Sequence, residues 1–320
     1  MRARIIGTGS YLPESVLTND DLSKIVDTSD EWISSRTGIR QRHLAVNENT
    51  VSMSTQAARR AMEEASVTAE ELDLIIVATC SPDTFTPNTA CSVQANIGAA
   101  RAVAFDVNTA CSGFVFALNI ADMYMAAGTF KTALIIGGET LSRFVDWTER
   151  STCVLFADGA GAAVLKADET GLISSSIGSD GTKGYAIYVE TRPVVNPCTP
   201  QEKPLDYLYM DGQEVFKFAV RKVPEVINKI LDETGYAADD VDWYILHQAN
   251  ARINSRIAKK LGVSLDKMPM NMDRCGNTSA ASIPLLLDEV NKKGLIKRGD
   301  KVMLAGFGAG LTWGGALLEW

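Results

Sequence analysis

The chain has 320 residues, of which 46% are apolar and 22% charged, proportions that are ordinary for a soluble globular protein. Its formal net charge of −8 argues against a general binder of nucleic acids or of anionic membranes. No apolar run approaches the roughly 18 residues that a membrane-spanning helix needs, and the N-terminus lacks the apolar region of a signal peptide. A chain of this length buries a large core, as one domain or as two fused ones.

Six cysteines, at positions 80, 91, 111, 153, 198 and 275, are spread along the chain without a C-x-x-C pair. Only two histidines, His43 and His247, accompany them. This pattern favours neither a zinc site nor a disulfide framework, and unpaired thiols are typical of a reducing compartment. We therefore expect a cytoplasmic protein that uses no metal and no cofactor.

The N-terminal ten residues predict a short strand that ends in a turn. Further along, Thr28 and Glu31 have the spacing of a capping box, which predicts the start of a short helix. Trp32 and Arg36 then lie one turn apart on one face of that helix. Taken alone, this pair is as consistent with a tryptophan packed on the protein body beneath its arginine as with a binding site.

A cysteine at the junction of a strand and a helix is the first candidate nucleophile. The apolar run 102–105 predicts a buried strand, and the stretch up to about residue 127 has helical spacing with few charges. Cys111 falls at the first turn of that helix, where unpaired N–H groups and the positive end of the dipole favour a thiolate. Because most free cysteines are simply buried apolar residues, this interpretation depends on what partners the thiol has.

Strands rich in Val, Ile and Leu alternate with helical segments, which predicts an α/β fold with mixed, mostly parallel sheets. Residues 64–78 resemble residues 233–247, and residues 131–137 resemble residues 300–306. Both pairs share one offset (247 − 78 = 169 and 306 − 137 = 169), which indicates duplication of an α/β unit. We expect an N-terminal half (1–169) with the nucleophile, a C-terminal half (170–320) with its partners, and a site between them.

Two polar residues of the second half are the candidate partners. His247 ends the apolar strand 241–246, where a catalytic side chain would project into a cleft, although most lone histidines make ordinary structural hydrogen bonds. Asn277 follows a tight turn at Gly276, and its structural alternative is to cap the small-residue helix that comes next. A helix between them carries four basic residues on one face, which is often only a solvated surface: Arg252, Arg256, Lys259 and Lys260.

Several segments together resemble the condensing enzymes of the thiolase superfamily, and most closely the ketoacyl-acyl carrier protein synthase III family, which initiates bacterial fatty acid synthesis. The resemblance covers nearly the whole chain. It implies a thiolase-like, five-layered αβαβα fold built from a duplicated half, in accord with the internal repeat. The matching segments are residues 28–40, 110–114 (ACSGF), 211–217, 247–250 (HQAN), 276–284 (GNTSAASIP) and 311–314.

The resemblance implies a decarboxylative Claisen condensation in which Cys111 first takes the acyl group of an acyl-CoA. Malonyl-acyl carrier protein then loses CO2, and its enolate attacks the acyl-enzyme to give a 3-oxoacyl-acyl carrier protein. By the same resemblance, His247 and Asn277 donate hydrogen bonds to the enolate oxygen. The backbone N–H groups of Cys111 and Ala309 form the oxyanion hole. The family has a glycine where this chain has Ala309, and a methyl group there requires a negative φ.

The resemblance also implies which residues handle the substrates. Trp32 and Arg36 would sandwich the adenine of CoA, and Arg150 would lie at the same pocket. Thr86 stands where acetyl-restricted relatives carry a phenylalanine that closes the acyl pocket of the neighbouring subunit of a homodimer. The smaller Thr86 favours a longer or branched primer, although the adjacent Phe85 could fill the same space. The implied contacts with acyl carrier protein are Gln248, Ala249, Asn250, Ala251, Arg252, Arg256, Lys259 and Lys260.

Other enzymes on the same fold are the competing interpretations. Elongation synthases use two histidines and biosynthetic thiolases a second C-terminal cysteine, whereas this chain offers one plausible histidine and no such cysteine. A 3-hydroxy-3-methylglutaryl-type synthase needs a glutamate base, and no comparable motif stands out. Two alternatives stay open: a starter-unit polyketide-type synthase, and a non-catalytic acyl-CoA-binding homologue, although the latter class usually loses its nucleophile.

Overall fold

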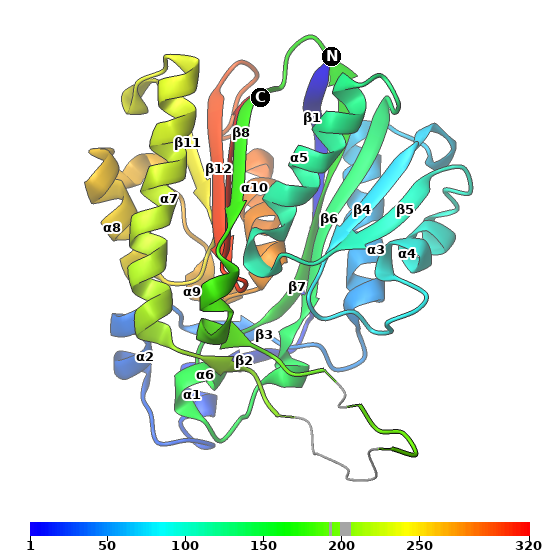
Figure 1. Ribbon diagram of the computed structural model, residues 1–320. Coiled ribbons are helices and arrows are strands. Elements are labelled where there is room, and N and C mark those ends of the chain that lie inside the picture. The colour runs from blue at the N-terminus through cyan, green and yellow to red at the C-terminus, as the bar shows by residue number, and fades with distance from the viewer. Residues whose placement is uncertain (192–193, 199–205) are drawn as a thin grey trace.

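Two β-sheets form the frame of the computed structural model, which describes residues 1–191, 194–198 and 206–320 (Figure 1). The first sheet has five strands and the second has four. The first runs β1 (Arg2–Tyr11), β7 (Asp158–Asp168), β6 (Thr132–Thr140), β4 (Leu74–Ala78) and β5 (Val103–Val107). The second runs β11 (Trp243–Leu246), β12 (Lys301–Gly308), β13 (Thr312–Glu319) and β8 (Leu172–Ser179).

Both sheets are mixed, as expected, but they contain more antiparallel pairing than the sequence predicted. β4 pairs in parallel with β5 and β6, and β11 pairs in parallel with β12. β7 and β13 each run antiparallel to both of their neighbours. β13 follows β12 after a short turn, which can only join antiparallel neighbours, whereas β7 follows β6 after the longer connection 141–157.

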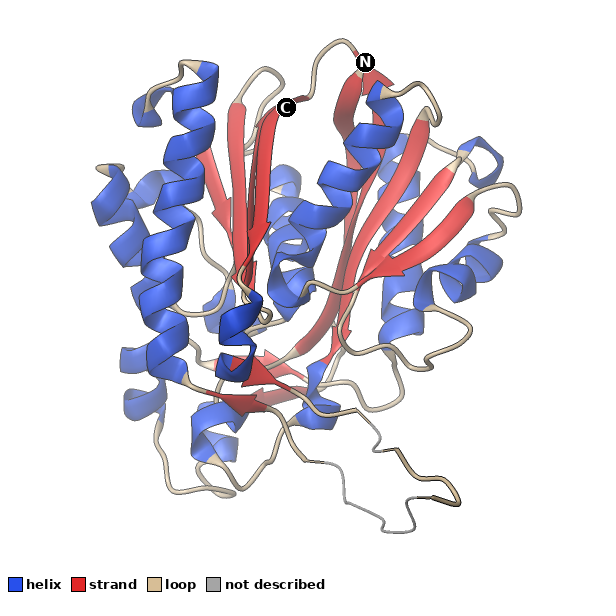
Figure 2. Ribbon diagram, in the orientation of Figure 1, coloured by secondary structure: helices blue, strands red, loops and turns tan. Residues whose placement is uncertain are grey.

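Helices cover both outer faces and fill the space between the sheets (Figure 2). α3 (Thr50–Ala65) and α4 (Thr89–Ile97) pack on the outer face of the first sheet. α5 (Gly113–Ala126) and α10 (Ser282–Lys292) lie between the sheets, and α7 (Gly212–Thr234) and α8 (Ala251–Leu261) cover the outer face of the second. The order helix, sheet, helix, sheet, helix confirms the predicted five-layered α/β fold.

Three hydrophobic cores correspond to the layers: one lies between each sheet and its outer helices, and the third fills the space between the two sheets. In the central core, Phe114 and Leu118 of α5 pack with Leu286 of α10 and with strands of both sheets. α5 is apolar around most of its circumference because both of its sides are covered, whereas α7 has one face in solvent. Each large side chain buried in this way contributes roughly 1.5–3 kcal/mol to the stability of the fold.

The duplication is visible in the element boundaries. β6 and β12 begin at residues 132 and 301, and α5 and α10 begin at residues 113 and 282, so both differences equal 169. The short 3-10 turns ahead of the two central helices, Ala110–Ser112 and Ser279–Ala281, are also 169 residues apart. Each turn starts with a residue of positive φ, 46° at Ala110 and 48° at Ser279. The repeat therefore extends to an unusual backbone conformation.

Smaller elements form a cap at one end of the sheets and have a hydrophobic cluster of their own (Figure 1). The helix that carries Trp32 and Arg36 is confirmed, but its N-cap is Ser29 rather than Thr28, since the Ser29 hydroxyl accepts the Trp32 N–H. The short elements are β2 (Val16–Thr18), α1 (Asn19–Leu22), α2 (Asp30–Thr37), β3 (Gln41–His43), α6 (Arg150–Cys153), β9 (Ile187–Tyr188), β10 (Tyr209–Met210) and α9 (Met272–Cys275).

The strand predicted at residues 102–105 exists as β5, but the prediction that it is buried was wrong. β5 is the last strand of its sheet, and Val103 is 49% exposed. An apolar sequence looks the same at a sheet edge as at a sheet centre, so only the topology reveals the difference. In the part of the chain that the structure describes, no helix is both long enough and apolar enough to span a membrane.

Candidate active site

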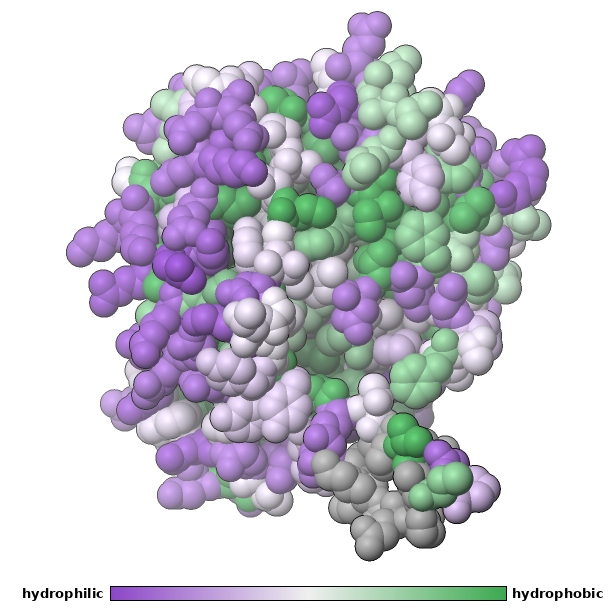
Figure 3. All heavy atoms as spheres, viewed as in Figure 1, coloured by the Kyte–Doolittle hydropathy of each residue, from purple (hydrophilic) through white to green (hydrophobic). Residues whose placement is uncertain are grey.

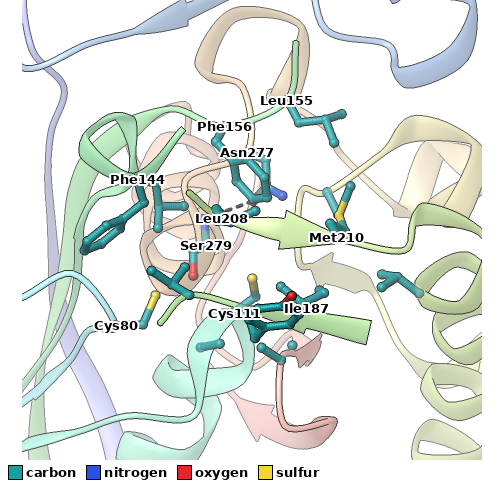
Figure 4. A pocket seen from close by; sticks show the side chains of 18 of the residues that line it. Cys80, Cys111, Phe144, Leu155, Phe156, Ile187, Leu208, Met210, Asn277 and Ser279 are labelled. Atoms are coloured by element: carbon teal, nitrogen blue, oxygen red, sulfur yellow. Dashed lines mark hydrogen bonds between the residues drawn. The ribbon is translucent and has the colours of Figure 1, made fainter. Parts of the chain in front are cut away.

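A cavity of about 1380 Å³ brings the three candidate catalytic residues together. Cys111 comes from the first half of the chain, and His247 and Asn277 come from the second. Figure 3 shows a hydrophobic hollow near the middle of the molecular face, and Figure 4 shows Cys111 and Asn277 from inside this pocket. Trp32, Arg36, Arg150 and Ala309 also line the cavity, so it joins the implied CoA site to the implied oxyanion hole.

Cys111 lies in the 3-10 turn that leads directly into α5, as the sequence predicted. Gly308 at the end of β12 allows this turn to approach, because a Cβ at Gly308 would lie 2.6 Å from the Cys111 backbone nitrogen. The thiol is placed at the N-terminal end of a helix that is packed between two sheets. Its position is therefore fixed by both halves of the chain.

The expectation that the helix end favours a thiolate stays a prediction, and the burial of Cys111 acts against it. Burial raises the pKa of the Cys111 thiol to about 12, an effect that the hydroxyl of Ser279 opposes and the nearby Glu139 reinforces. A rise from 9.0 to about 12 corresponds to about 4 kcal/mol, whereas a helix N-terminus supplies at most about 2 kcal/mol. By this comparison desolvation is the larger of the two effects, and it favours the thiol form of Cys111.

Alkylation of Cys111 by iodoacetamide is expected to accelerate about tenfold per pH unit between about pH 7 and pH 10. The reason is that the thiolate is the reactive species and stays a minor one below its pKa of about 12. Mass spectrometry of the Cys111 peptide measures the rate, with the exposed Cys198 as an internal comparison. A rate that levels off below pH 9 would show that the helix end does activate the thiol.

His247 follows β11 directly and is buried as a neutral imidazole. Burial lowers its pKa to about 3, and its ring packs edge-on against Phe307, with ring centroids 5.2 Å apart. Its Nδ1 lies 2.6 Å from the Ser282 hydroxyl, which itself accepts the Gln248 N–H at 3.3 Å. Among the described residues, Nδ1 is the one acceptor that pairs with the hydroxyl proton of Ser282. Ser282 therefore donates to Nδ1, which leaves the ring proton on Nε2.

Asn277 is held on both sides by backbone hydrogen bonds. Its N–H donates to the Leu155 carbonyl and its carbonyl accepts the Ala157 N–H, both at 2.9 Å. The Oδ1 atom accepts the Ser279 N–H at 3.0 Å, so the proposed capping role is partly real. The Nδ2 group makes no hydrogen bond with a described residue, and Asn277 lines the cavity (Figure 4). The amide thus anchors itself with its oxygen and keeps its donor available.

Ala309 meets the condition that a methyl group at this position requires, which is a negative φ. It lines the cavity, and it is not among the non-glycine residues with positive φ. A methyl group is therefore compatible with the local backbone. The backbone N–H of Cys111 lies in the first turn of a helical segment, where N–H groups have no partner within the helix. Both groups are placed where they could serve a shared oxyanion hole.

The residues predicted to bind CoA form one stacked group at the cavity wall. The guanidinium carbons of Arg36 and Arg150 each lie 4.5 Å from the centre of the Trp32 ring. The Arg150 guanidinium also donates to the Asp27 carbonyl at 2.8 Å, which holds it next to the segment that precedes α2. The indole therefore already has two planar cations beside it, and an adenine that entered the stack would exchange with one of them.

The residues predicted to contact a carrier protein fall into two groups. Gln248 is 0% exposed and uses both ends of its amide inside the chain, with the Leu246 carbonyl and the Asn271 N–H, so it is not a surface contact. Asn250 caps α8, while Ala249 and Ala251 are only partly exposed. The exposed group comprises Arg252, Arg256, Lys259 and Lys260, and none of these forms an ion pair with a described residue.

The structure places only part of the segment that was predicted to border the acyl pocket at the cavity. Thr86 is exposed and does not line the cavity of its own chain, whereas Thr84 and Phe85 do. Phe85 is 80% exposed, so its ring borders the rim rather than filling the cavity. Since the prediction placed Thr86 in the pocket of a neighbouring subunit, its role stays a prediction.

Sequence reasoning missed the residues that support the catalytic set. Ser282 fixes the tautomer of His247, Ser279 orients Asn277, and Phe307 packs on the imidazole. Ser279 and Ser282 lie within the matched segment 276–284, so that motif was the one available signal for them. Glu139, buried behind Ser279, had no such signal.

Two family models match one segment in each half of the chain. The model described as 3-oxoacyl-[acyl-carrier-protein (ACP)] synthase III matches residues 105–181, and its C-terminal counterpart matches residues 231–320. The β-ketoacyl-[acyl-carrier-protein] synthase III of Clostridium acetobutylicum is 52% identical over 319 residues, which cover 99% of this chain and 98% of the relative. The chain belongs to the 3-oxoacyl-[acyl-carrier-protein] synthase III family.

Solved structures agree with this assignment to the synthase III family. The crystal structure of 3-oxoacyl-[acyl-carrier-protein] synthase III from Aquifex aeolicus superposes with a TM-score of 0.93 at 46% identity and covers 99% of this chain and 100% of its own. A priming β-ketosynthase of a polyketide biosynthetic pathway has a TM-score of 0.92 at 34% identity, with 99% and 96% coverage. The predicted family, fold class and enzyme class, a condensing acyltransferase, are confirmed.

Proposed function

We propose that this synthase III transfers an acyl group from acyl-CoA to Cys111 and condenses it with malonyl-acyl carrier protein. The products are a 3-oxoacyl-acyl carrier protein, CoA and CO2, and the reaction starts fatty acid synthesis. The observation that carries the proposal is the single cavity in which a thiol from one half faces a neutral imidazole and a neutral amide from the other.

In the first half-reaction the Cys111 sulfur attacks the thioester carbonyl of acyl-CoA. The bond from the carbonyl carbon to the CoA sulfur breaks, and the thiol proton finishes on CoA, so the step is balanced without a further acid or base. The backbone N–H groups of Cys111 and Ala309 stabilise the negative oxygen of the tetrahedral intermediate. Their donors belong to the fixed backbone, which needs no reorganisation as the charge develops.

In the second half-reaction the malonyl thioester loses CO2, and the electrons of the broken C–C bond form an enolate. The Nε2–H of His247 and the Nδ2 group of Asn277 donate to the enolate oxygen. Because burial lowers the pKa of His247 to about 3, the imidazole stays a neutral donor throughout the physiological range. The enolate carbon then attacks the acyl group, and the released Cys111 sulfur takes a proton from solvent.

The test is mass spectrometry of the protein after incubation with a mixture of acyl-CoAs of different chain length. We expect one acyl group per chain, located on the Cys111 peptide, and its removal when malonyl-acyl carrier protein is added. Acylation elsewhere, or none, would contradict the proposal and favour a non-catalytic acyl-CoA-binding protein. The acyl chains that are retained would also test the role of Thr86 in accepting longer or branched primers.

Acyl carrier protein is proposed to dock on the basic face of α8, defined by Arg252, Arg256, Lys259 and Lys260. Two features support this: Arg252 lines the cavity mouth, and Phe216 with Val220 forms an apolar floor next to Arg256. Hydrophilic residues gather over α7 and α8 in Figure 3. Four cations that form no ion pair with any residue the structure describes would attract an acidic carrier electrostatically.

The variant Arg252→Glu is expected to raise KM for malonyl-acyl carrier protein about tenfold and to leave KM for acyl-CoA unchanged. The reason is that charge reversal at the cavity mouth repels the acidic carrier, whereas the cations stacked on Trp32 are Arg36 and Arg150 and stay unchanged. Steady-state kinetics with each substrate varied in turn measures this. Lys297→Glu, an exposed reversal outside the cavity lining, is the matched control. Equal KM values for the carrier in all three proteins would rule out this docking surface.

We further propose a homodimer and a chain divided into two halves at residues 169 and 170. The dimer is supported by the exposed edge of β5, whose unpaired backbone groups and apolar Val103 favour association with a second sheet. The division is supported by the recurrence of elements at a spacing of 169 residues (301 − 132). A cytoplasmic location rests on the unpaired thiols alone and stays a prediction.

A further inference from the structure

A buried carboxyl group lies behind the catalytic residues and has no part in the proposed reaction. Glu139, in β6, is 0% exposed and does not line the cavity. Its oxygens accept the hydroxyls of Thr79 at 3.2 Å, of Ser279 at 3.0 Å and of Ser81, and the N–H and thiol of Cys80. Burial raises the pKa of Glu139, and the donors from Ser81, Cys80 and Ser279 act against this rise.

The contact with Ser279 connects Glu139 to the active site. The Ser279 hydroxyl donates to Glu139, while the Ser279 N–H donates to Asn277 Oδ1 at 3.0 Å. That second bond turns the Asn277 amide so that its Nδ2 group is the free donor. Ser279 also has a φ of 48°, a left-handed conformation that is unfavourable for a non-glycine residue. A strained residue needs other contacts to hold it, and the bond to Glu139 is one of them.

The duplication shows what is specific about this contact. Glu139 corresponds to Gly308, and Ser279 corresponds to Ala110, at the common spacing of 169 residues (308 − 139 and 279 − 110). In one half, Gly308 leaves room for the turn that bears Cys111. In the other half, the side chain of Glu139 fills the equivalent place and binds the equivalent turn. One turn is thus left open to substrate, and the other is tied down.

We propose that Glu139 is a positioning residue that holds Ser279 and, through it, the enolate-binding amide of Asn277. This inference rests on the proposed function, since it assigns Asn277 to decarboxylation. Glu139 is not the glutamate base of a 3-hydroxy-3-methylglutaryl-type synthase, because it is fully buried and its oxygens already accept five donor groups.

The decisive variant is Glu139→Gln, which keeps the shape but replaces one acceptor oxygen by an NH2 group facing donors. We expect malonyl-acyl carrier protein decarboxylation to fall at least about tenfold, while acylation of Cys111 by acyl-CoA does not fall, because loss of the Glu139 charge favours the Cys111 thiolate. A carboxyl group with only a general structural role would lower both half-reactions together. The matched control is Asp288→Asn, a buried carboxylate paired with Thr8 and Lys292 outside the cavity lining, which should change neither half-reaction.

A double-mutant cycle tests the route through Ser279. Ser279→Ala should lower decarboxylation to a similar extent, and adding Glu139→Gln should cause little further loss because the connecting hydroxyl is already absent. If Glu139→Gln fails to fold, Ser279→Ala alone still decides, since unchanged decarboxylation in that variant overturns the proposal. Three other results would also overturn the proposal. These are unchanged decarboxylation in Glu139→Gln, an equal loss of both half-reactions in that variant, and a double variant whose loss equals the product of the two single losses. Absence of decarboxylation in the unmodified enzyme would instead refute the proposed function.

Discussion

Cys111→Ser is expected to form no acyl-enzyme and to lose condensation by a factor on the order of 10³ or more. Burial already raises the pKa of the thiol to about 12, and a serine hydroxyl in the same place is far harder to ionise. The Nε2 atom of His247 carries a proton, because Ser282 donates to Nδ1, so the imidazole is not a free base for this hydroxyl. Mass spectrometry after incubation with acyl-CoA and a condensation assay measure the two losses.

Decarboxylation separates the role of Cys111 from general damage to the site. It depends on His247 and Asn277, which come from other elements, so Cys111→Ser should still release CO2 from malonyl-acyl carrier protein. Cys91→Ser is the matched control, because that thiol in α4 lies outside the cavity lining. Acyl transfer to Cys111→Ser at more than a few per cent of the normal extent would mean that another residue is the nucleophile.

Asn277→Asp is expected to reduce decarboxylation by more than about 10³-fold while leaving acylation of Cys111 close to normal. Loss of one such donor costs about 10²–10³ in rate, and the aspartate adds a negative charge that repels the enolate. The shape is nearly unchanged, and an aspartate oxygen can still accept the Ser279 N–H. Release of CO2 from malonyl-acyl carrier protein, with acylation measured in parallel, gives the ratio of the two half-reactions.

The control for this substitution is Asn119→Asp, the same chemical change on α5 at a residue outside the cavity lining. It should leave both half-reactions unchanged. If Asn277→Asp lowered acylation as strongly as decarboxylation, Asn277 would be acting on Cys111 rather than on the enolate. The measurement thus assigns the amide to one step.

The meeting of Cys111, His247 and Asn277 in one cavity could be predicted from the sequence, because each lies in a short motif at the end of a strand or in a turn. The internal spacing also placed Cys111 and His247 in different halves before their cavity was known. Burial was harder to predict. The apolar sequence of β5 gave no sign that it ends a sheet, and the position of Cys111 at a helix gave no measure of the desolvation that raises its pKa.

The residues that support the candidate catalytic residues could not be predicted from the sequence for a different reason. Glu139 follows two glycines in a buried strand, and nothing within that segment indicates a partner at Ser279, which lies 140 residues later. Likewise, the tautomer of His247 depends on Ser282, which lies on α10, 35 residues later in the chain. Contacts of this kind arise from the packing of layers, whereas motifs record only what is near in the chain.

The central position of α5 and α10 also bears on how the enzyme folds. Because both helices are buried between the sheets, an isolated N-terminal half would leave one flank of α5 in water, with Phe114 and Leu118 losing part of their cover. The two halves therefore stabilise one another as subunits of a dimer do, although one chain connects them. Unfolding should accordingly be cooperative across residues 1–320, and limited proteolysis near residue 170 should release no stable half. The reactive thiol and its two donors are then gained or lost together.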